Sequence, residues 1–256
     1  MIDPRAVIDP RARLDSSVEV GPFSIIGPDV EIDAGTWIGP HVVINGVTRI
    51  GRDNRIYQFS SLGEVPQDKK YRDEPTRLEI GDRNLIREYV TINRGTAQDQ
   101  GLTRIGDDNW IMAYVHIAHD CMIGNHTIFA NAASLAGHVL VDDYVILGGF
   151  TLVSQFLHLG INSFTAMGSV VNRDVPPYVT VSGHMAKPYG INLEGLKRRG
   201  FSTKVITQVR QAYKLLYKSK LLFEEATTQI EAMSADCPEL VPMAEFIKNA
   251  KRGIIR

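Results

Sequence analysis

Large aliphatic residues recur at every sixth position along most of the chain. The recurrence covers positions 2–62 without a gap, resumes over 80–92, and continues from 105 to 159 with a phenylalanine at 129. A period of six fits neither an α-helix, which repeats at 3.6, nor a half-buried strand, which repeats at 2. It fits one flat face of a three-sided coil, so three faces make a turn of 18 residues. The 24 hexad positions are enough for eight full coils.

Small and β-branched residues accompany this hexad repeat. Many lie two residues before the large aliphatic, as Ser24, Val30 and Thr36 do, and glycine often follows it, as at Gly27 and Gly39. Large side chains that point to the axis, with small ones in the corners, describe a solenoid in which each coil buries its face against the next. The sequence therefore predicts a mainly β protein built as a parallel β-helix, rather than a β-sandwich with accidental spacing.

Two polar segments interrupt the repeat, at 63–79 and 96–104. The first spans one 18-residue period between its flanking hexad residues, so we expect the coil to resume in register after a looped-out excursion. Loops on a rigid scaffold often carry function. Two consecutive prolines within 175–178 are expected to stop strand pairing, because proline cannot donate a ladder hydrogen bond.

After about residue 190 the periodicity becomes helical, with Ser202 placed to cap a helix that has one apolar stripe. Three helices are expected, over 202–217, 223–233 and 240–250. We therefore divide the chain into a β-helix domain at 1–189 and a small C-terminal α-helical domain at 190–256. The helices would also cover the open strand edges at one end of the solenoid.

Composition narrows the class of protein. The chain has 256 residues, of which 44% are hydrophobic and 22% charged, and no apolar run approaches the ~18 residues that span a membrane. The N-terminus lacks a basic and then apolar signal region, and two cysteines are too few for a disulfide framework. We expect a cytoplasmic protein with no integral membrane segment and no nucleic-acid partner.

The net charge of −1 is unevenly spread. Residues 187–256 carry 13 Lys or Arg and 7 Asp or Glu, a balance of +6, so residues 1–186 carry −7. The asymmetry fits either a solvated helical surface or a docking face for an acidic partner.

The segment His-Ile-Ala-His-Asp-Cys is the densest cluster of polar functional groups. Its isoleucine is the inward hexad residue, so His119 and Asp120 should fall at a corner and point outward. Residues 18 apart stack on neighbouring coils, about one strand spacing of ~4.8 Å apart. This count places Gly137 and then Gln155 above His119, with His138 one residue past the glycine.

Such a column suits acyl transfer. A neutral His119 can take a proton from a hydroxyl as general base near pH 7, while Asp120 fixes its tautomer and stabilises the imidazolium. The N–H of Gly137 can donate to the oxyanion of the tetrahedral intermediate. Cys121 points inward on this register, so no nucleophile is placed for a covalent step and direct attack is favoured.

A more specific resemblance is carried by six stretches: 50–71 (IGRDNRIYQFSSLGEVPQDKKY), 74–96 (EPTRLEIGDRNLIREYVTINRGT), 116–125 (HIAHDCMIGN), 134–143 (SLAGHVLVDD), 174–178 (DVPPY) and 190–202 (GINLEGLKRRGFS). They resemble the UDP-N-acetylglucosamine O-acyltransferases, hexapeptide-repeat enzymes that open lipid A synthesis in Gram-negative bacteria. The resemblance implies a left-handed β-helix and a homotrimer with sites in the clefts between subunits. It implies transfer of an (R)-3-hydroxyacyl group from acyl carrier protein to the 3-hydroxyl of UDP-N-acetylglucosamine. No metal and no cofactor is implied beyond the phosphopantetheine of the carrier protein.

Carried over by position, the resemblance assigns His119 as the general base, Asp120 as its orienting partner and Gly137 as the oxyanion donor. It assigns substrate binding to Gln67, Asp68, Lys70, His116, His138, Gln155, Asn192, Glu194 and Arg198. Of these, Asp68 would hold the sugar and Arg198 would meet the diphosphate or ribose. The plain alternatives are a solvated loop around Asp68 and helix capping around Asn192.

Three positions depart from the family pattern. Asn93 and Ser154 stand where many relatives have histidine, so neither is expected to do indispensable proton chemistry. Met167 replaces the glycine of long-chain relatives and stacks over Gly149, where it would block the far end of an acyl groove. We expect a donor of ~10 carbons, because each excluded methylene changes transition-state binding by roughly 1–3 kcal/mol. The alternative for Met167 is packing in the core.

Acyl carrier proteins are acidic, so the basic C-terminal segment has a candidate partner. The expected contacts are Lys197, Arg198, Arg199, Lys204 and Arg210.

Other functions stay open. A second enzyme reading is a hexapeptide acyltransferase that uses coenzyme A. A third possible function is that of a zinc enzyme like the hexapeptide carbonic anhydrases, with the metal on His116, His119 and His138. A fourth is that of a trimeric scaffold or binding protein.

Overall fold

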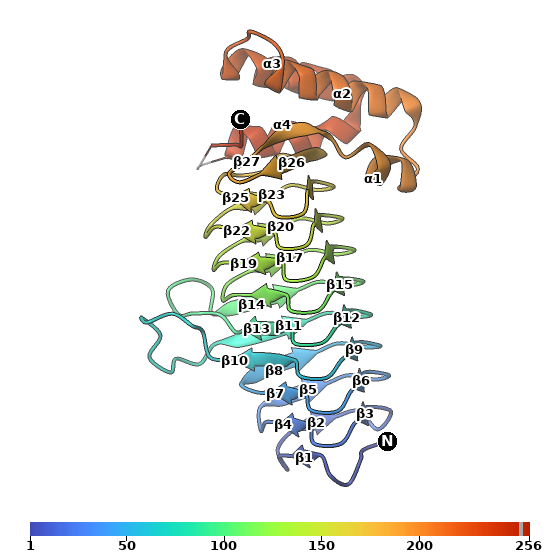
Figure 1. Cartoon of the computed structure of the whole chain (residues 1–256), viewed down its shortest axis with the longest axis vertical. Coiled ribbons are helices and arrows are strands. Elements are labelled where there is room, and N and C mark those ends of the chain that lie inside the picture. The colour runs from blue at the N-terminus through green and yellow to red at the C-terminus, as the bar shows by residue number, and fades with distance from the viewer. Residues whose placement is uncertain (251–252) are drawn as a thin grey trace.

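The hexads of the sequence form short strands, and the strands collect into three parallel sheets that wind around a common axis (Figure 1). The computed structural model describes residues 1–250 and 253–256. Along uninterrupted coils the paired residues are 18 apart, as in the pairing of Val7 with Ile25 and of Ile117 with Leu135. The predicted parallel β-helix is confirmed.

We name each sheet by its first strand. The β1 sheet contains β1 (Val7–Ile8), β4 (Ile25–Ile26), β7 (Val43–Ile44), β10 (Ser61–Glu64), β13 (Thr91–Asn93), β16 (His116–Ile117), β19 (Ser134–Leu135), β22 (Leu152–Val153) and β25 (Val170–Val171). The β2 sheet contains β2 (Arg13–Leu14), β5 (Val30–Ile32), β8 (Val47–Ile50), β11 (Arg77–Ile80), β14 (Leu102–Ile105), β17 (Met122–Ile123), β20 (Leu140–Val141) and β23 (His158–Leu159). The β3 sheet contains β3 (Glu19–Val20), β6 (Trp37–Ile38), β9 (Arg55–Ile56), β12 (Leu85–Ile86), β15 (Trp110–Ile111), β18 (Ile128–Phe129), β21 (Ile146–Leu147), β24 (Phe164–Thr165), β26 (Val179–Gly183) and β27 (Ala186–Ile191).

Each coil turns three corners. Corner 1 leads from the β1 sheet to the β2 sheet, corner 2 leads on to the β3 sheet, and corner 3 returns the chain to the β1 sheet of the next coil. Many corners contain one residue whose backbone has a positive φ, in the left-handed region, and this residue is often not glycine. At corner 1, Asp120, His138 and Phe156 have φ of 60°, 62° and 63°. Equivalent corner positions therefore stack in columns from coil to coil.

The interior of the solenoid is apolar along the axis, and most of the polar side chains buried at its corners have hydrogen-bond partners. Hexad residues such as Ile38 and Ile117 are fully buried. At corner 2 a ladder of buried amides passes from coil to coil. Oδ1 of Asn54 accepts the N–H of Asn84 over 2.9 Å, and Oδ1 of Asn84 accepts the N–H of Asn109 over 2.9 Å. Pairing of this kind removes the cost of burying polar groups.

Both insertions leave the solenoid at corner 1, on consecutive coils, and project on the same side (Figure 1). Leu62 lies in the β1 sheet and Ile80 in the β2 sheet, where Ile80 pairs with Ile50. The expectation that the first insertion spans one full coil is therefore wrong. The loop lengthens a single corner, so its flanking hexad residues lie on neighbouring faces rather than on the same face.

The two prolines do not stop strand pairing, contrary to the expectation. Pro176 and Pro177 lie at corner 2, between Val175, which bridges to Leu159, and β26. On earlier coils the equivalent N–H donates to the next coil, as the N–H of Gly160 does to the carbonyl of Val175, but no further coil of the β2 sheet follows Pro176, so the missing N–H costs nothing there. Strand β26 pairs in parallel with β24 and antiparallel with β27, and this hairpin was not foreseen.

Helices close the C-terminal end of the solenoid (Figure 1). They are α1 (Leu193–Arg198), α2 (Thr203–Tyr217), α3 (Phe223–Asp236), the 3₁₀ turn η1 (Pro238–Leu240) and α4 (Val241–Asn249). The predicted cap is confirmed, because Oγ of Ser202 accepts the N–H of Val205 over 3.2 Å. Helix α1 was not foreseen. The boundary set at 189/190 falls within β27, and the division into two domains stays a prediction.

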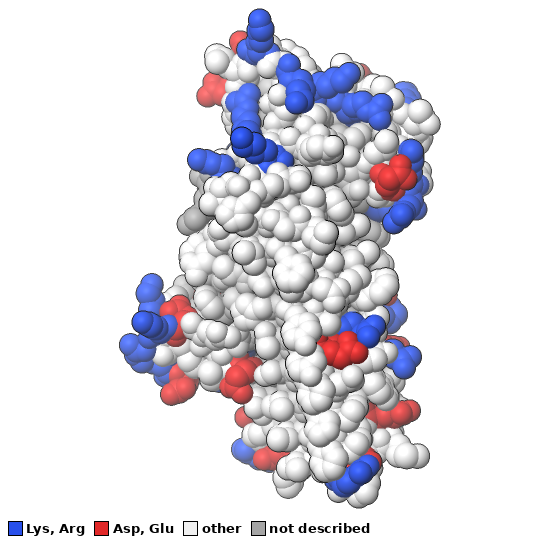
Figure 2. Space-filling model, viewed as in Figure 1, with Lys and Arg blue, Asp and Glu red and all other residues white. Residues whose placement is uncertain are grey.

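Net positive charge is concentrated toward the helical end. Figure 2 shows Lys and Arg gathered over the helices, while the middle of the β-helix on this face is largely free of charged side chains. Among the described residues, no helix combines the length and the apolar character needed to cross a bilayer.

Candidate active site

His119 and Asp120 form a hydrogen-bonded pair at corner 1, between β16 and β17. Nδ1 of His119 lies 2.8 Å from Oδ2 of Asp120, and the two side chains are only 7% and 1% exposed. The corner position is as predicted, and the two side chains are buried there rather than open to solvent. The second insertion covers the corner, and Thr96 and Asp99 of this loop contact the site directly.

Asp120 is held as a carboxylate by its hydrogen bonds. Thr96 donates its N–H to Oδ1 over 2.8 Å and its hydroxyl to Oδ2 over 2.6 Å. Burial alone would raise the pKa of Asp120, but the bonds from His119 and Thr96 outweigh it, and the pKa lies below its ordinary value. The ionised carboxylate therefore orients the imidazole with a hydrogen on Nδ1 and leaves Nε2 for the substrate.

Gly137 lies directly against the ring of His119. A Cβ on this glycine would come within 2.5 Å of Cε1 and 2.7 Å of Nε2 of His119, so no other residue fits without moving the imidazole. The coils continue in the same column, because the carbonyl of His119 accepts the N–H of His138, and the carbonyl of Gly137 accepts the N–H of Phe156. Within the described chain the N–H of Gly137 has no hydrogen-bond partner, and Gln155 is exposed one coil further on.

His138 packs beside the pair at the same corner. Its Nδ1 lies 2.8 Å from Oδ2 of Asp99, and its Nε2 lies 3.8 Å from Oδ2 of Asp120. Its ring stacks on Phe156 with centroids 4.4 Å apart, and meets His119 edge-on at 5.0 Å. Three predicted residues, His119, Asp120 and His138, therefore share one site with Gly137.

His116 lies on β16, on the outer side of the β1 sheet. Its Nδ1 is 2.8 Å from Oγ1 of Thr91. Burial, and then the nearby His119, lower its pKa, so the ring favours the neutral form. Among the described residues, the metal-ligating atoms that come within 4.8 Å of one another belong to His119, Asp120 and His138, so the three-histidine zinc site does not form.

The first insertion carries Gln67, Asp68 and Lys70 out from the same corner. Gln67 and Lys70 are exposed, and Asp68 accepts the N–H of Lys70 over 2.9 Å. The loop is anchored by the next coil, where the amide of Asn93 donates to the carbonyl of Val65 over 2.8 Å. Asn93 thus has a structural task.

The third group of predicted residues lies on a different side of the molecule. Asn192, Glu194 and Arg198 line a cavity of about 640 Å³ against corner 2 and the β3 sheet, with Tyr144 and Tyr189. Asn192 is buried and caps α1, because its Oδ1 accepts the N–H of Gly195 over 3.1 Å. Within one chain the structure does not bring this cavity to the His119 site.

Met167 lies at corner 3 and is 77% exposed, so it does not pack in the core. A Cβ on Gly149 would lie 3.9 Å from Cγ of Met167, which confirms the predicted stacking of these two positions. Cys121 is fully buried, and burial raises the pKa of its thiol to about 12. Such a thiol is not a nucleophile near neutral pH.

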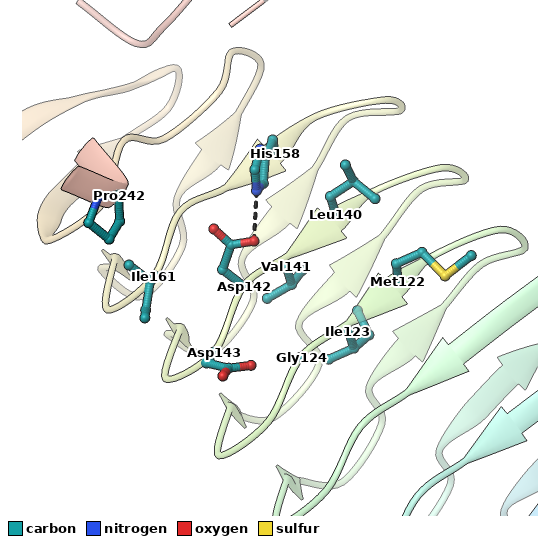
Figure 3. Close-up of a pocket in the computed structure, with 10 residues that line it drawn as sticks. All are labelled: Met122, Ile123, Gly124, Leu140, Val141, Asp142, Asp143, His158, Ile161 and Pro242. Carbon is teal, nitrogen blue, oxygen red and sulfur yellow. Dashed lines mark hydrogen bonds and ion pairs between the residues drawn. The ribbon is translucent and has the colours of Figure 1, made fainter. Parts of the chain in front are cut away.

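A second hollow lies on the β2 sheet beside α4 (Figure 3). It measures about 530 Å³ and holds a separate pair, in which Nε2 of His158 lies 2.8 Å from Oδ1 of Asp142 (Figure 3). None of the residues predicted for the site lines it. The hollow is therefore separate from the residues gathered at corner 1.

Sequence reasoning missed Thr96 and Asp99, although they lie in a segment that had been singled out. The only available signal was a polar loop that breaks the hexad count. Which of its side chains turn back onto corner 1 depends on the loop conformation, which the period does not determine.

The hexad solenoid is that of a hexapeptide-repeat transferase. A profile described as bacterial transferase hexapeptide (six repeats) matches residues 102–137, and one described as UDP N-acetylglucosamine O-acyltransferase, domain 2, matches 174–255. Proteins named acyl-(acyl-carrier-protein)–UDP-N-acetylglucosamine O-acyltransferase from Herminiimonas arsenicoxydans and Halorhodospira halophila are 56% and 59% identical, covering 100% of this chain and 99% of theirs. The chain belongs to this family of O-acyltransferases.

Solved structures agree with this assignment. The UDP-N-acetylglucosamine acyltransferase of Francisella novicida has a TM-score of 0.98 at 41% identity, over 100% of this chain and 94% of that one. The enzyme of Moraxella catarrhalis has a TM-score of 0.97 at 43% identity, over 100% and 99%. The resemblance drawn from the sequence stretches is confirmed, and the fold is the left-handed parallel β-helix with C-terminal helices.

Proposed function

We propose that this protein transfers an (R)-3-hydroxyacyl group from acyl carrier protein to the 3-hydroxyl of UDP-N-acetylglucosamine, as the first step of lipid A synthesis in the cytoplasm. Full-length relatives carry the name of this reaction. The observation that carries the proposal is the buried pair of His119 and Asp120 beside Gly137, whose N–H has no hydrogen-bond partner among the residues that the structure describes.

In the proposed reaction His119 is the general base. Its Nε2 takes the proton of the sugar 3-hydroxyl while the oxygen attacks the thioester carbonyl. The N–H of Gly137 donates to the oxyanion, and the ionised Asp120 stabilises the imidazolium. When the tetrahedral intermediate collapses, the carbon–sulfur bond breaks and the imidazolium returns its proton to the phosphopantetheine thiolate. No acyl-enzyme forms, in keeping with the inert thiol of Cys121.

We infer that the complete site needs a neighbouring copy in a homotrimer. The pair of His119 and Asp120, here called the dyad, is at corner 1. The segment proposed to bind the nucleotide, which includes Arg198, lines the cavity by the β3 sheet. Corner 3 also presents an exposed aromatic stack that includes Phe59, Tyr89 and Tyr114, with centroids 4.8–4.9 Å apart. A second chain packed there would cover apolar surface that is costly to leave in water.

Subunit complementation tests this assembly. His119→Ala and Arg198→Ala subunits should each form inactive homotrimers, while a mixed assembly regains part of the activity at interfaces that join one intact dyad to one intact Arg198. Mixed trimers that stay as inactive as the parents would contradict a shared site. Light scattering gives the oligomeric state independently.

The first insertion is proposed to hold the sugar through Asp68, with Gln67 and Lys70 beside it. His116, His138 and Gln155 are proposed to contact the substrates at corner 1, and Asn192 and Glu194 to bind the nucleotide together with Arg198. The basic helical end is proposed to dock the acidic carrier protein, since like charges there would otherwise repel one another.

Met167 is proposed to limit the acyl chain to ~10 carbons. It lies 48 positions after His119, so the rise between them along the axis is roughly 13 Å at ~4.8 Å per coil, and because Met167 is at corner 3 and His119 at corner 1 this rise is the lower limit of their separation within one chain. An extended chain advances ~1.2 Å per bond, so ten or eleven bonds span that rise. Met167→Gly should move the preferred donor to longer chains in a series of acyl carrier protein thioesters, and an unchanged preference would contradict the ruler role.

Mass spectrometry of the product tests the function as a whole. UDP-N-acetylglucosamine is offered with a mixed pool of 3-hydroxyacyl carrier proteins and, separately, with the matching coenzyme A thioesters. We expect a mono-O-acylated sugar nucleotide from the carrier protein pool, and none with His119→Ala. Product from the coenzyme A pool alone would favour the coenzyme A transferase. No product from either pool, with a folded trimer, would favour the scaffold.

A further inference from the structure

A carboxylate from the second insertion holds one nitrogen of His138. Oδ2 of Asp99 lies 2.8 Å from Nδ1 of His138, although the two residues are 39 positions apart. The loop that carries Asp99 leaves corner 1 one coil before His119, and His138 lies one coil after it. Asp99 therefore reaches across the coil of the dyad to contact the histidine beyond it.

The other contacts of His138 fix its ring. The ring stacks on Phe156 with an interplanar angle of 8°, and His119 meets it at 88°. The side chain is 14% exposed, so little of it is open to water. With Asp99 at Nδ1, the ring has one orientation, in which Nε2 faces Oδ2 of Asp120 at 3.8 Å.

An ionised carboxylate can only accept hydrogen bonds. Asp99 therefore requires a hydrogen on Nδ1 of His138, and this decides that Nε2 is the nitrogen available to the reacting groups. The arrangement repeats the one next to it, where Asp120 holds a hydrogen on Nδ1 of His119. A ring that is free to exchange tautomers or to flip would lose this preorganisation.

We propose that Asp99 is a positioning residue that acts through His138: it keeps the hydrogen on Nδ1 and so presents Nε2 to the substrate beside His119. This inference rests on the proposed acyl transfer at corner 1. A purely structural role is the competing explanation, in which the contact only ties the loop to the solenoid and leaves the chemistry unaffected.

A double-mutant cycle separates these two roles. Asp99→Ala should lower kcat/KM by about tenfold, as expected for a lost hydrogen bond to a charged group. The same change on a His138→Ala background should have no further effect, because its target has gone. Asp99→Asn keeps an oxygen that accepts from Nδ1–H, so it should stay within about threefold of the parent. Gln100→Ala, one residue along the same exposed loop, is the matched control and should keep full activity.

The outcomes decide the matter. The inference is overturned if kcat/KM of Asp99→Ala equals that of Gln100→Ala, or if Asp99→Ala loses as much kcat/KM without His138 as with it. It is also overturned if a lower Tm alone explains the loss of kcat/KM. If the parent protein transfers the acyl group but the cycle shows no coupling, only the role of Asp99 fails. If the parent transfers no acyl group, the proposed function fails first and the inference fails with it.

Discussion

Replacing Thr96 by valine removes one hydrogen bond from the carboxylate of Asp120, the proposed partner of the general base, and changes little else. The hydroxyl of Thr96 donates to Oδ2 of Asp120 over 2.6 Å, while its N–H donates to Oδ1 over 2.8 Å. Valine has nearly the shape of threonine and keeps the N–H. Thr127 is a matched control away from the site, because its hydroxyl and N–H both bind Oδ1 of Asn109, over 2.6 and 2.8 Å.

The two threonines are equally buried, so the difference between them comes from the acceptor. A hydrogen bond to a charged group contributes ~1.5–3 kcal/mol and one to a neutral group ~1 kcal/mol. We expect Thr96→Val to lower the free energy of unfolding by about 2 kcal/mol and Thr127→Val by about 1 kcal/mol. Because Asp120 orients His119, Thr96→Val should also lower kcat by about tenfold, or ~1.4 kcal/mol in the barrier. Thr127→Val should leave kcat unchanged.

The pH dependence gives a sharper distinction. Burial would raise the pKa of Asp120, yet hydrogen bonds from His119 and Thr96 hold it below its ordinary value. A carboxyl group with a lowered folded-state pKa contributes stability above the unfolded pKa, ~3.9, and this contribution is lost as pH falls through the folded pKa. Thr96→Val raises the folded pKa. The stability difference between variant and parent should therefore be complete above pH ~4 and shrink below it.

Urea unfolding between pH ~3 and 7 measures this difference. The loss caused by Thr127→Val should not change with pH, because asparagine does not titrate. If the loss caused by Thr96→Val is equally flat, Asp120 is not an ionised acceptor in the native protein. In that case the role of Asp120 as the charged partner of His119 is also refuted.

Three other changes test different parts of the structure. Gly137→Ala places a Cβ 2.5 Å from Cε1 of His119, so kcat/KM should fall by roughly a hundredfold while circular dichroism shows the fold retained. Asn84→Ala breaks the buried amide ladder between Asn54 and Asn109, and should cost roughly 2–4 kcal/mol in urea unfolding; a loss under ~1 kcal/mol would mean that water replaces the amide. Raising the salt concentration should weaken use of the acyl carrier protein more than use of the sugar nucleotide, and equal responses of the two KM values would argue against an electrostatic docking face.

The hexad count predicted the solenoid and the columns because parallel coils pair residue for residue. Once the count reaches 18 per coil, a position on one coil determines the positions above and below it. This is why Gly137 could be placed against His119 from the sequence alone, and the close approach of this glycine to the imidazole agrees. Met167 and Gly149 stack for the same reason.

The burial of His119 and Asp120 could not be predicted from the hexad period. His119 and Asp120 are buried because a loop folds back over corner 1, through contacts between residues 24 and 39 positions apart. The period also failed to place the first insertion. Its length equals one 18-residue period by coincidence, whereas in the structure it only lengthens a single corner. The segment proposed to bind the nucleotide is a third case, because α1 begins where the β-hairpin ends, and the cap at Asn192 serves this junction.

The covering loop and the donors it carries depend on each other. Covering a bare corner strengthens the bond between His119 and Asp120, because water no longer competes for it. The same burial would drive Asp120 toward its neutral form if nothing replaced the lost water. Thr96 supplies two donors to that carboxylate from the segment that excludes the water, so shielding and compensation come from one insertion. The regular hexads place His119 beside Asp120, and the broken repeat adds Thr96, so the proposed chemistry depends on both parts of the chain.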